Sequence, residues 1–266
     1  MKVYICTDLE GISGITLFTQ TREEGPAYER ARSLLMGDVN AAVQGCLDGG
    51  ASVVRILDGH GHPLNFVPEE MHPGAEYIAG KGFPTLAVGV DETFDCAMLI
   101  GSHAMCRTPD GVLYHTQNSR MDCRYWYNGV ESGEIAQDAM IYGHFDIPVV
   151  MVSADTAGCR EARQFLGENV VTVAVKEGYG RECCKMLAPT RAHELIREGA
   201  AEAMKRIKEC RPYKGETPLR ARLERLIEPA PEGATAEEID ALPHVAFEKT
   251  CESQLDIYAF PPETQV

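Results

Sequence analysis

Short apolar runs that alternate with helix-like segments constrain the fold of this chain more than any other feature. Five runs have the length and the β-branched composition of buried strands. They cover residues 2–7, 52–57, 96–101, 148–153 and 170–175. Helical periodicity is found at residues 27–47, 135–142 and 156–165. Strands that alternate with helices form βαβ units, so we predict an α/β fold with a mostly parallel sheet flanked by helices.

The last part of the chain has a different pattern. A long amphipathic helix that begins near residue 190 is followed by a linker at residues 212–218. The residues after this linker carry several prolines and only one short apolar segment. We therefore predict an α/β domain over residues 1–210, which carries the candidate site described below, and a smaller α+β C-terminal part over residues 211–266.

Charge and length exclude several classes of protein. The net charge of −15 leaves no broad basic surface, so we expect no binding to nucleic acid. No stretch of eighteen apolar residues is present, so we expect no membrane span. The chain starts directly in a predicted strand, without a basic and apolar leader, and its ten cysteines include no C-x-x-C pair. We therefore expect a cytoplasmic protein with reduced thiols.

Three of the predicted strands are followed by residues that can bind metal. Asp8 and Glu10 follow the first strand, His60 follows the second, and His103 follows the third. The carboxyl ends of parallel strands lie at one edge of a sheet, so these side chains are expected to converge. Imidazole and carboxylate donors together suit zinc first and manganese second. A carboxylate that bridges two ions would make a two-metal site able to polarise a carbonyl group.

Each of these residues also has a simpler interpretation. A single histidine at a strand end is more often a hydrogen-bonded structural residue than a ligand, and Asp8 and Glu10 alone could be solvated acids of a turn. Asp58 either orients a ligand histidine or caps its own turn. The coincidence of three strand ends favours the metal interpretation for the whole set.

Two further residues are candidates for the same site. His115 lies in a polar stretch after the third strand, where a loop histidine can act as a general acid or base or as a nucleophile. Glu134 lies at the start of a predicted helix. An acid in this position usually complements the helix dipole, and its alternative role is that of a metal ligand.

These motifs resemble those of a known family. Residues 7–14, TDLEGISG, resemble the S-x-D-x-E-G signature of the DppA-type D-aminopeptidases, with Cys6 in place of the serine. The family consists of zinc peptidases that are also known as dipeptide transport proteins. Further motifs follow in the family's order at residues 58–60, 99–104, 114–116, 133–134 and 146–152. The similarity extends to about residue 187, whereas residues after about 211 align poorly.

The resemblance implies a dinuclear zinc site in a large assembly. The family's two zinc ions would be held by Asp8, as the bridging ligand, and by Glu10, His60, His103 and Glu134. The family's nucleophile corresponds to His115. The family also forms a self-compartmentalising homo-oligomer, a decamer of stacked pentamers whose active sites face an inner chamber.

We therefore predict a cytoplasmic dinuclear zinc aminopeptidase that hydrolyses short peptides. An N-terminal D-amino acid is a candidate feature of the substrate. His115 would either attack the substrate or activate a water molecule, and the sequence leaves both roles open.

Two alternatives to this function remain open. Another two-metal amidohydrolase or phosphoesterase could use the same ligands, and four arginines near the motifs could hold a phosphate. These are Arg55, Arg107, Arg120 and Arg124. A non-catalytic peptide-binding protein is the second alternative.

Overall fold

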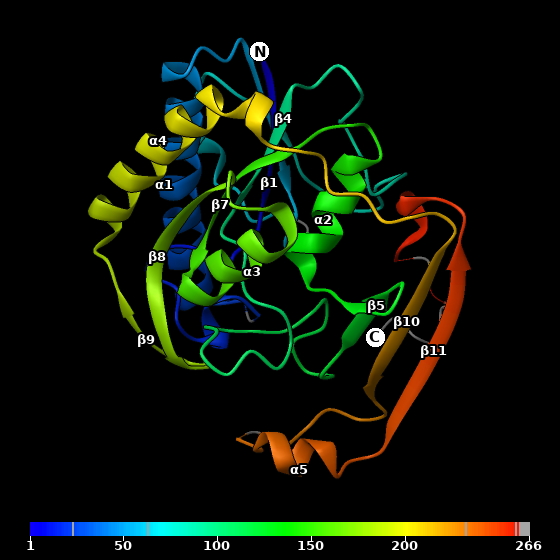
Figure 1. Ribbon diagram of the computed structural model, residues 1–266. Helices are drawn as coiled ribbons and strands as arrows, with labels where there is room; N and C mark the ends of the chain where they lie inside the picture. Colours follow the sequence, from blue (N-terminus) through cyan, green and yellow to red (C-terminus); the bar gives the residue numbers. More distant parts are fainter. Residues whose placement is uncertain (23, 63, 232, 259, 261–266) are drawn as a thin grey trace.

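The computed structural model describes residues 1–22, 24–62, 64–231, 233–258 and 260 (Figure 1). A seven-stranded sheet forms its centre, and all neighbouring strands are parallel except for the last pair. In spatial order the strands are β3 (Glu76–Ile78), β2 (Val53–Asp58), β1 (Lys2–Thr7), β4 (Cys96–Ile100), β7 (Val149–Asp155), β8 (Val171–Gly180) and β9 (Cys183–Met186). The mostly parallel sheet and all five predicted strands are confirmed, while β3 and β9 were not predicted.

The central strand β1 shows why the sheet is covered on both faces. Alternate residues of a strand point to opposite faces, and here both sets are apolar and buried. Val3 and Ile5 belong to one hydrophobic core, and Tyr4 and Cys6 belong to the other. The sheet therefore needs helices on each side.

Two pairs of helices meet this need. On the face of Val3 and Ile5, α1 (Pro26–Asp48) packs along α4 (Pro189–Lys205) (Figure 1). Both helices begin with proline at their first position, where the missing N–H is not required. The other core contains residues of α2 (Glu134–Gly143) and α3 (Thr156–Leu166). The predicted layers of helices are confirmed on both faces.

A second, antiparallel sheet joins the end of the chain to its middle. Its order is β11 (His244–Cys251), β10 (Leu219–Leu226), β5 (Arg124–Tyr127) and β6 (Val130–Glu131). A short helix, α5 (Ala236–Asp240), lies between β10 and β11. The segment after residue 210 thus contains strands and a helix, and its strands complete a sheet that begins at β5. The division of the chain at residue 210 stays a prediction.

Short 3₁₀ helices complete the described secondary structure, at Phe18–Gln20, Pro68–Glu70, Ile207–Glu209 and Gln254–Asp256. Among the described helices, none combines the length and apolar character that crossing a membrane requires. The ten cysteines are all unpaired, and eight of them are buried.

Candidate metal centre

The site is built at the carboxyl edge of three neighbouring strands. Strand β1 lies between β2 and β4, and their register places Thr7 level with Asp58 on one side and with Ile100 on the other. The residues that follow these three positions therefore start from the same edge of the sheet. This alignment brings together the loops that carry Asp8, His60 and His103.

The loops after β1 and β4 are in direct contact, and glycine makes this possible. A Cβ atom at Gly11 would lie 1.9 Å from the carbonyl oxygen of Ser102, which is far inside van der Waals contact. Gly101 has a φ of +84°, and a Cβ atom there would lie 2.2 Å from the carbonyl oxygen of Asp8. Any larger residue would push the two loops apart, so the glycines set the spacing of the site.

Carboxylates and imidazoles of these loops face each other at close range. His60 Nε2 lies 3.3 Å from Glu10 Oε1, and His103 Nε2 lies 3.3 Å from Asp8 Oδ2. Glu134, at the first position of α2, places its Oε1 atom 3.4 Å from His103 Nε2. One ligand atom from each of Asp8, Glu10 and His103 can be chosen so that all three lie within 4.8 Å of one another.

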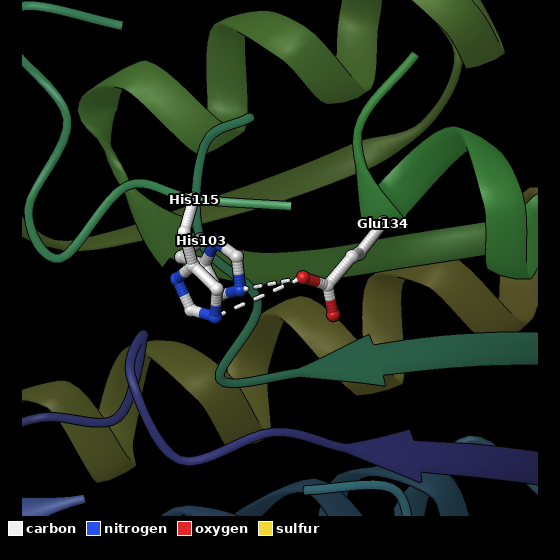
Figure 2. A group of neighbouring side chains, drawn as sticks. All are labelled: His103, His115 and Glu134. Atoms are coloured by element: carbon white, nitrogen blue, oxygen red, sulfur yellow. Dashed lines mark ion pairs between the residues drawn. The ribbon is translucent and has the colours of Figure 1, made fainter. Parts of the chain in front are cut away.

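His115 stands beside this group. Figure 2 shows that the rings of His103 and His115 lie face to face and that both point toward Glu134. The ring centroids are 4.0 Å apart and the planes differ by 11°. His115 Nε2 lies 3.9 Å from Glu134 Oε1. The six residues predicted from the sequence therefore meet at one place.

The hydrogen bonds of the three histidines direct the same ring nitrogen into the site. His103 Nδ1 lies 3.0 Å from the carbonyl oxygen of Ala104, and His115 Nδ1 lies 2.8 Å from that of Leu113. A carbonyl oxygen can only accept, so each Nδ1 must carry the proton. In the neutral form of each ring, the remaining Nε2 atom carries a lone pair and faces carboxylates.

His60 is oriented through a residue that the sequence did not single out. Its Nδ1 lies 3.3 Å from Asn65 Oδ1, and the amide nitrogen of Asn65 donates to Asp58 Oδ1 at 2.7 Å. The backbone N–H of Asn65 donates to the other oxygen of Asp58, also at 2.7 Å. Asp58 therefore orients the ligand candidate His60 indirectly, by fixing Asn65. This link depends on the shape of the loop, which leaves no signal in the spacing of the residues.

The donor atoms fit a zinc ion. Two ligands about 2.1 Å from a tetrahedral zinc ion lie roughly 3.4 Å apart. The nitrogen–oxygen separations in the site are 3.3 to 3.4 Å for three of the pairs. His103 Nε2 and Glu10 Oε2 are buried and have no hydrogen-bond partner among the described residues. Buried polar atoms are nearly always satisfied, and a cation between these groups would satisfy both.

The charges of the site shift the pKa values of its members. Burial opposes the charged form of His103, but Glu134 and Asp8 outweigh it and raise the pKa of His103 well above its usual range. Burial also opposes the ionisation of Glu134, yet His103 lowers the pKa of Glu134 to about 2. His115 behaves differently, because burial and the neighbouring His103 lower its pKa to about 4. The imidazole of His115 is thus neutral near pH 7 and keeps a free lone pair.

A buried lysine holds the loop that presents Glu10. The Nζ atom of Lys176, on β8, donates to the carbonyl oxygens of Glu10, Ile12 and Ile15 at 2.6, 3.1 and 2.7 Å. Asp38 of α1 binds the same loop through the backbone N–H and hydroxyl group of Ser13. These contacts join residues far apart in the chain, so the sequence pattern did not reveal them.

Comparisons with known proteins show what this chain is similar to. The family model described as D-aminopeptidase, peptidase family M55, matches residues 1–257. A D-aminopeptidase of Bacillus subtilis (strain 168) is 33% identical over 214 residues, which are 80% of this chain and 77% of that protein. A solved structure described as the Zn-dependent D-aminopeptidase DppA from Bacillus subtilis, a self-compartmentalizing protease, superposes with a TM-score of 0.84. It is 27% identical, and the match covers 97% of this chain and 94% of that one.

Proposed function

The chain belongs to the D-aminopeptidase family and is a metallo-aminopeptidase, and on this premise we propose that it uses two zinc ions to hydrolyse short peptides with an N-terminal D-amino acid. The observation that carries this proposal is the convergence of carboxylate and Nε2 atoms at one sheet edge. The proposed ligands are Asp8, Glu10, His60, His103 and Glu134.

The arrangement of these donors supports two ions rather than one. Glu10 and His60 form one close pair, and His103 and Glu134 form another. Asp8 lies near His103 and within reach of Glu10, between the two pairs. We therefore assign the bridging role to Asp8. The mixture of imidazole and carboxylate donors and the zinc dependence of the similar structure favour zinc, and none of the three comparisons supports manganese.

The residues of the chain prepare the site for attack on a peptide carbonyl. Bound zinc supplies positive charge that polarises the scissile carbonyl group and stabilises negative charge on its oxygen. The stacked ring of His103 and the bond to Leu113 hold His115 with its free Nε2 toward the site. From this position His115 either attacks the carbonyl carbon or takes a proton from an attacking water molecule.

A single experiment tests the function and the role of His115. We would measure zinc content and the hydrolysis of D-Ala and L-Ala p-nitroanilides for the native chain, His115→Ala and His144→Ala. His144 is exposed and lies outside the site, so it is the matched control. We expect His115→Ala to keep its zinc and to lose activity, and we expect hydrolysis of the D-substrate by the native chain and the control. Full activity in His115→Ala would remove His115 from the reaction.

The rival function of a phosphoesterase has less support. Three of the four arginines considered for phosphate binding are already ion-paired: Arg55 with Glu76, Arg107 with Asp122 and Asp240, and Arg124 with Glu131. Such pairs leave little free charge for a phosphate ester. A panel of phosphate esters, assayed with the zinc-loaded chain, would reveal a phosphoesterase.

The assembly, the location and the division of the chain are also proposals. The similar structure is described as self-compartmentalizing, and we propose that this chain forms a homo-oligomer in the cytoplasm, as a decamer of stacked pentamers. Native mass spectrometry would then give ten times the chain mass of 29.2 kDa. We further propose that residues 1–210 carry the metal centre and that residues 211–266 shape the substrate cavity beside it, to which Leu255 and Tyr258 contribute.

A further inference from the structure

Two cavities share lining residues at the metal centre. The larger one has a volume of about 660 Å³ and the smaller one about 370 Å³. Both are lined by Asp8, Gly59, Gln117 and Glu134, so they meet at the proposed ligands. A substrate bound at the centre therefore has space to extend in two directions.

The larger cavity carries only negative charge beyond the proposed ligands. Its remaining charged residues are Asp58, Asp138 and Asp256, and no lysine or arginine belongs to its described lining. Asp58 is occupied, because both of its oxygens accept hydrogen bonds from Asn65. Asp256 is exposed to solvent. Asp138 is thus the acid inside this cavity whose carboxylate has no ion-pair partner among the described residues.

Asp138 has a position that suits a cation of the substrate. It follows Glu134 by one turn of α2, and side chains four residues apart on a helix have Cβ atoms about 5–6 Å apart. The thiol of Cys6 lies within hydrogen-bonding reach of its carboxylate, but no described lysine, arginine or histidine forms an ion pair with it. A carboxylate beside the apolar side chains of the cavity is costly unless a cation accompanies it.

The smaller cavity has the opposite charge. Beyond the proposed ligands, its charged side chains are those of Arg22 and Arg120. Neither forms an ion pair with a described carboxylate, although the chain carries a net charge of −15. Arg22 donates from Nε and Nη2 to Ser119, at 2.7 and 2.8 Å, which fixes the guanidinium at the cavity wall. Unpaired guanidinium groups on a concave wall suit a carboxylate.

The order of these charges around the centre suits a short peptide. In an aminopeptidase the scissile carbonyl belongs to the first residue, so the α-ammonium group must lie close to the centre, as Asp138 does. The terminal carboxylate lies one or two residues beyond the scissile bond, and a chain of two to three residues spans roughly 7–10 Å. Only a short peptide brings both charged ends near the centre at once.

We propose that the site recognises both ends of a di- or tripeptide, with Asp138 binding the α-ammonium group and Arg22 together with Arg120 binding the terminal carboxylate. This proposal rests on the proposed function, since it assumes that a peptide carbonyl is placed at the metal centre. In this arrangement Asp138 would select peptides with a free amino end, and the two arginines would limit the peptide length.

The test measures binding separately from cleavage. The probe is the ketomethylene analogue of D-Ala-D-Ala, in which a methylene group replaces the amide nitrogen so that it cannot be hydrolysed. It is compared with its N-acetyl and its C-terminal carboxamide derivatives by calorimetry on the zinc-loaded chain. The variants are Asp138→Asn, Arg22→Gln and Arg120→Gln, with Arg191→Gln on the outer face of α4 as the control.

We expect each variant to weaken binding only of ligands that carry the matching charge. A charge-assisted hydrogen bond contributes enough for a loss of about tenfold to hundredfold in affinity. Asp138→Asn should bind the parent and the carboxamide more weakly by this factor and should bind the N-acetyl ligand with unchanged affinity. Arg22→Gln and Arg120→Gln should bind the parent and the N-acetyl ligand more weakly by this factor and should bind the carboxamide with unchanged affinity. The side chain of Arg120 makes no hydrogen bond or ion pair with a described residue, so its variant keeps the test valid if Arg22→Gln disturbs the loop.

Two results would overturn the proposal: equal losses for all three ligands, or no loss in any variant. Turnover of D-Ala-D-Ala by the native chain is measured in parallel. Charge-selective binding without turnover would contradict the proposed function and leave the recognition of both ends intact. Turnover together with an affinity that does not depend on the end charges would support the proposed function and contradict the recognition of both ends.

Discussion

The metal centre and the antiparallel sheet hold their charged side chains in opposite ways. At the centre, buried and half-buried carboxylates and imidazoles face each other, and Glu10 Oε2 has no hydrogen-bond partner among the described residues. In the sheet, exposed charges pair with each other, as Arg222 does with Glu224 at 2.7 Å and with Glu248 at 3.0 Å. Buried polar groups that lack a hydrogen-bond partner within the protein indicate a ligand site, whereas charged side chains at the surface that pair with each other indicate a solvated face.

The strongest test of this contrast removes a proposed ligand. We expect His103→Ala to lose zinc and to lower kcat/KM for a D-Ala substrate by at least about 1,000-fold, since metal polarisation of a carbonyl is worth several kcal/mol. Zinc analysis and steady-state kinetics would measure both effects. A variant with native zinc content and native kcat/KM would remove His103 from the centre.

The next test concerns the support of the loop that carries Glu10. Lys176→Met leaves three carbonyl oxygens without their charged donor, and we expect a loss of about 3 kcal/mol in the free energy of unfolding. Urea denaturation would measure this loss. Lys185→Met is the control, because Lys185 is exposed and its one ion pair within the described part of the chain is with Glu177. Equal stability of the two variants would show that Lys176 does not hold the loop.

A smaller effect is expected where the protein orients a proposed ligand. Asn65→Ala removes the acceptor for His60 Nδ1, and such changes lower metal affinity by about 10- to 100-fold. Competition with a zinc chelator would measure the affinity, and a thermal melt would show that the chain is folded. Asn169→Ala, an exposed asparagine that bonds to Glu209, should keep native affinity. Native affinity in Asn65→Ala as well would contradict the proposed role of Asn65.

The smallest effect is expected in the antiparallel sheet. Arg222→Gln breaks two ion pairs that are open to solvent on at least one side, and such surface pairs contribute less than about 1 kcal/mol each. Zinc content and activity should stay unchanged, and a denaturation curve should shift little. A loss of zinc or activity in this variant would show that the two regions are coupled.

The parallel sheet could be predicted because its central strands are continuous apolar runs that are buried on both faces. The missed strands β3, β5, β6 and β9 have two to four residues each, too few for a periodic pattern. Strand β10 is a different case. Leu219, Ala221 and Leu223 alternate with charged residues, and this alternation was a usable signal for a strand with one buried face.

The site could be predicted in part for the same reason. Strand ends are visible in the sequence, and topology then brings Asp8, His60 and His103 to one edge. The structure adds Asn65 and Lys176, which act through loop geometry and through contacts across more than a hundred residues. Asp138 was missed because an acid in a helix has the same pattern whether it faces solvent or a cavity.

The central claim is that five side chains at one sheet edge hold two zinc ions. Anomalous diffraction at the zinc absorption edge, from crystals of the zinc-loaded chain, tests it most directly. The account predicts two peaks per chain, each about 2.0–2.2 Å from its ligand atoms, with a carboxylate oxygen of Asp8 near both. A single peak, or peaks away from Asp8, Glu10, His60, His103 and Glu134, would contradict it.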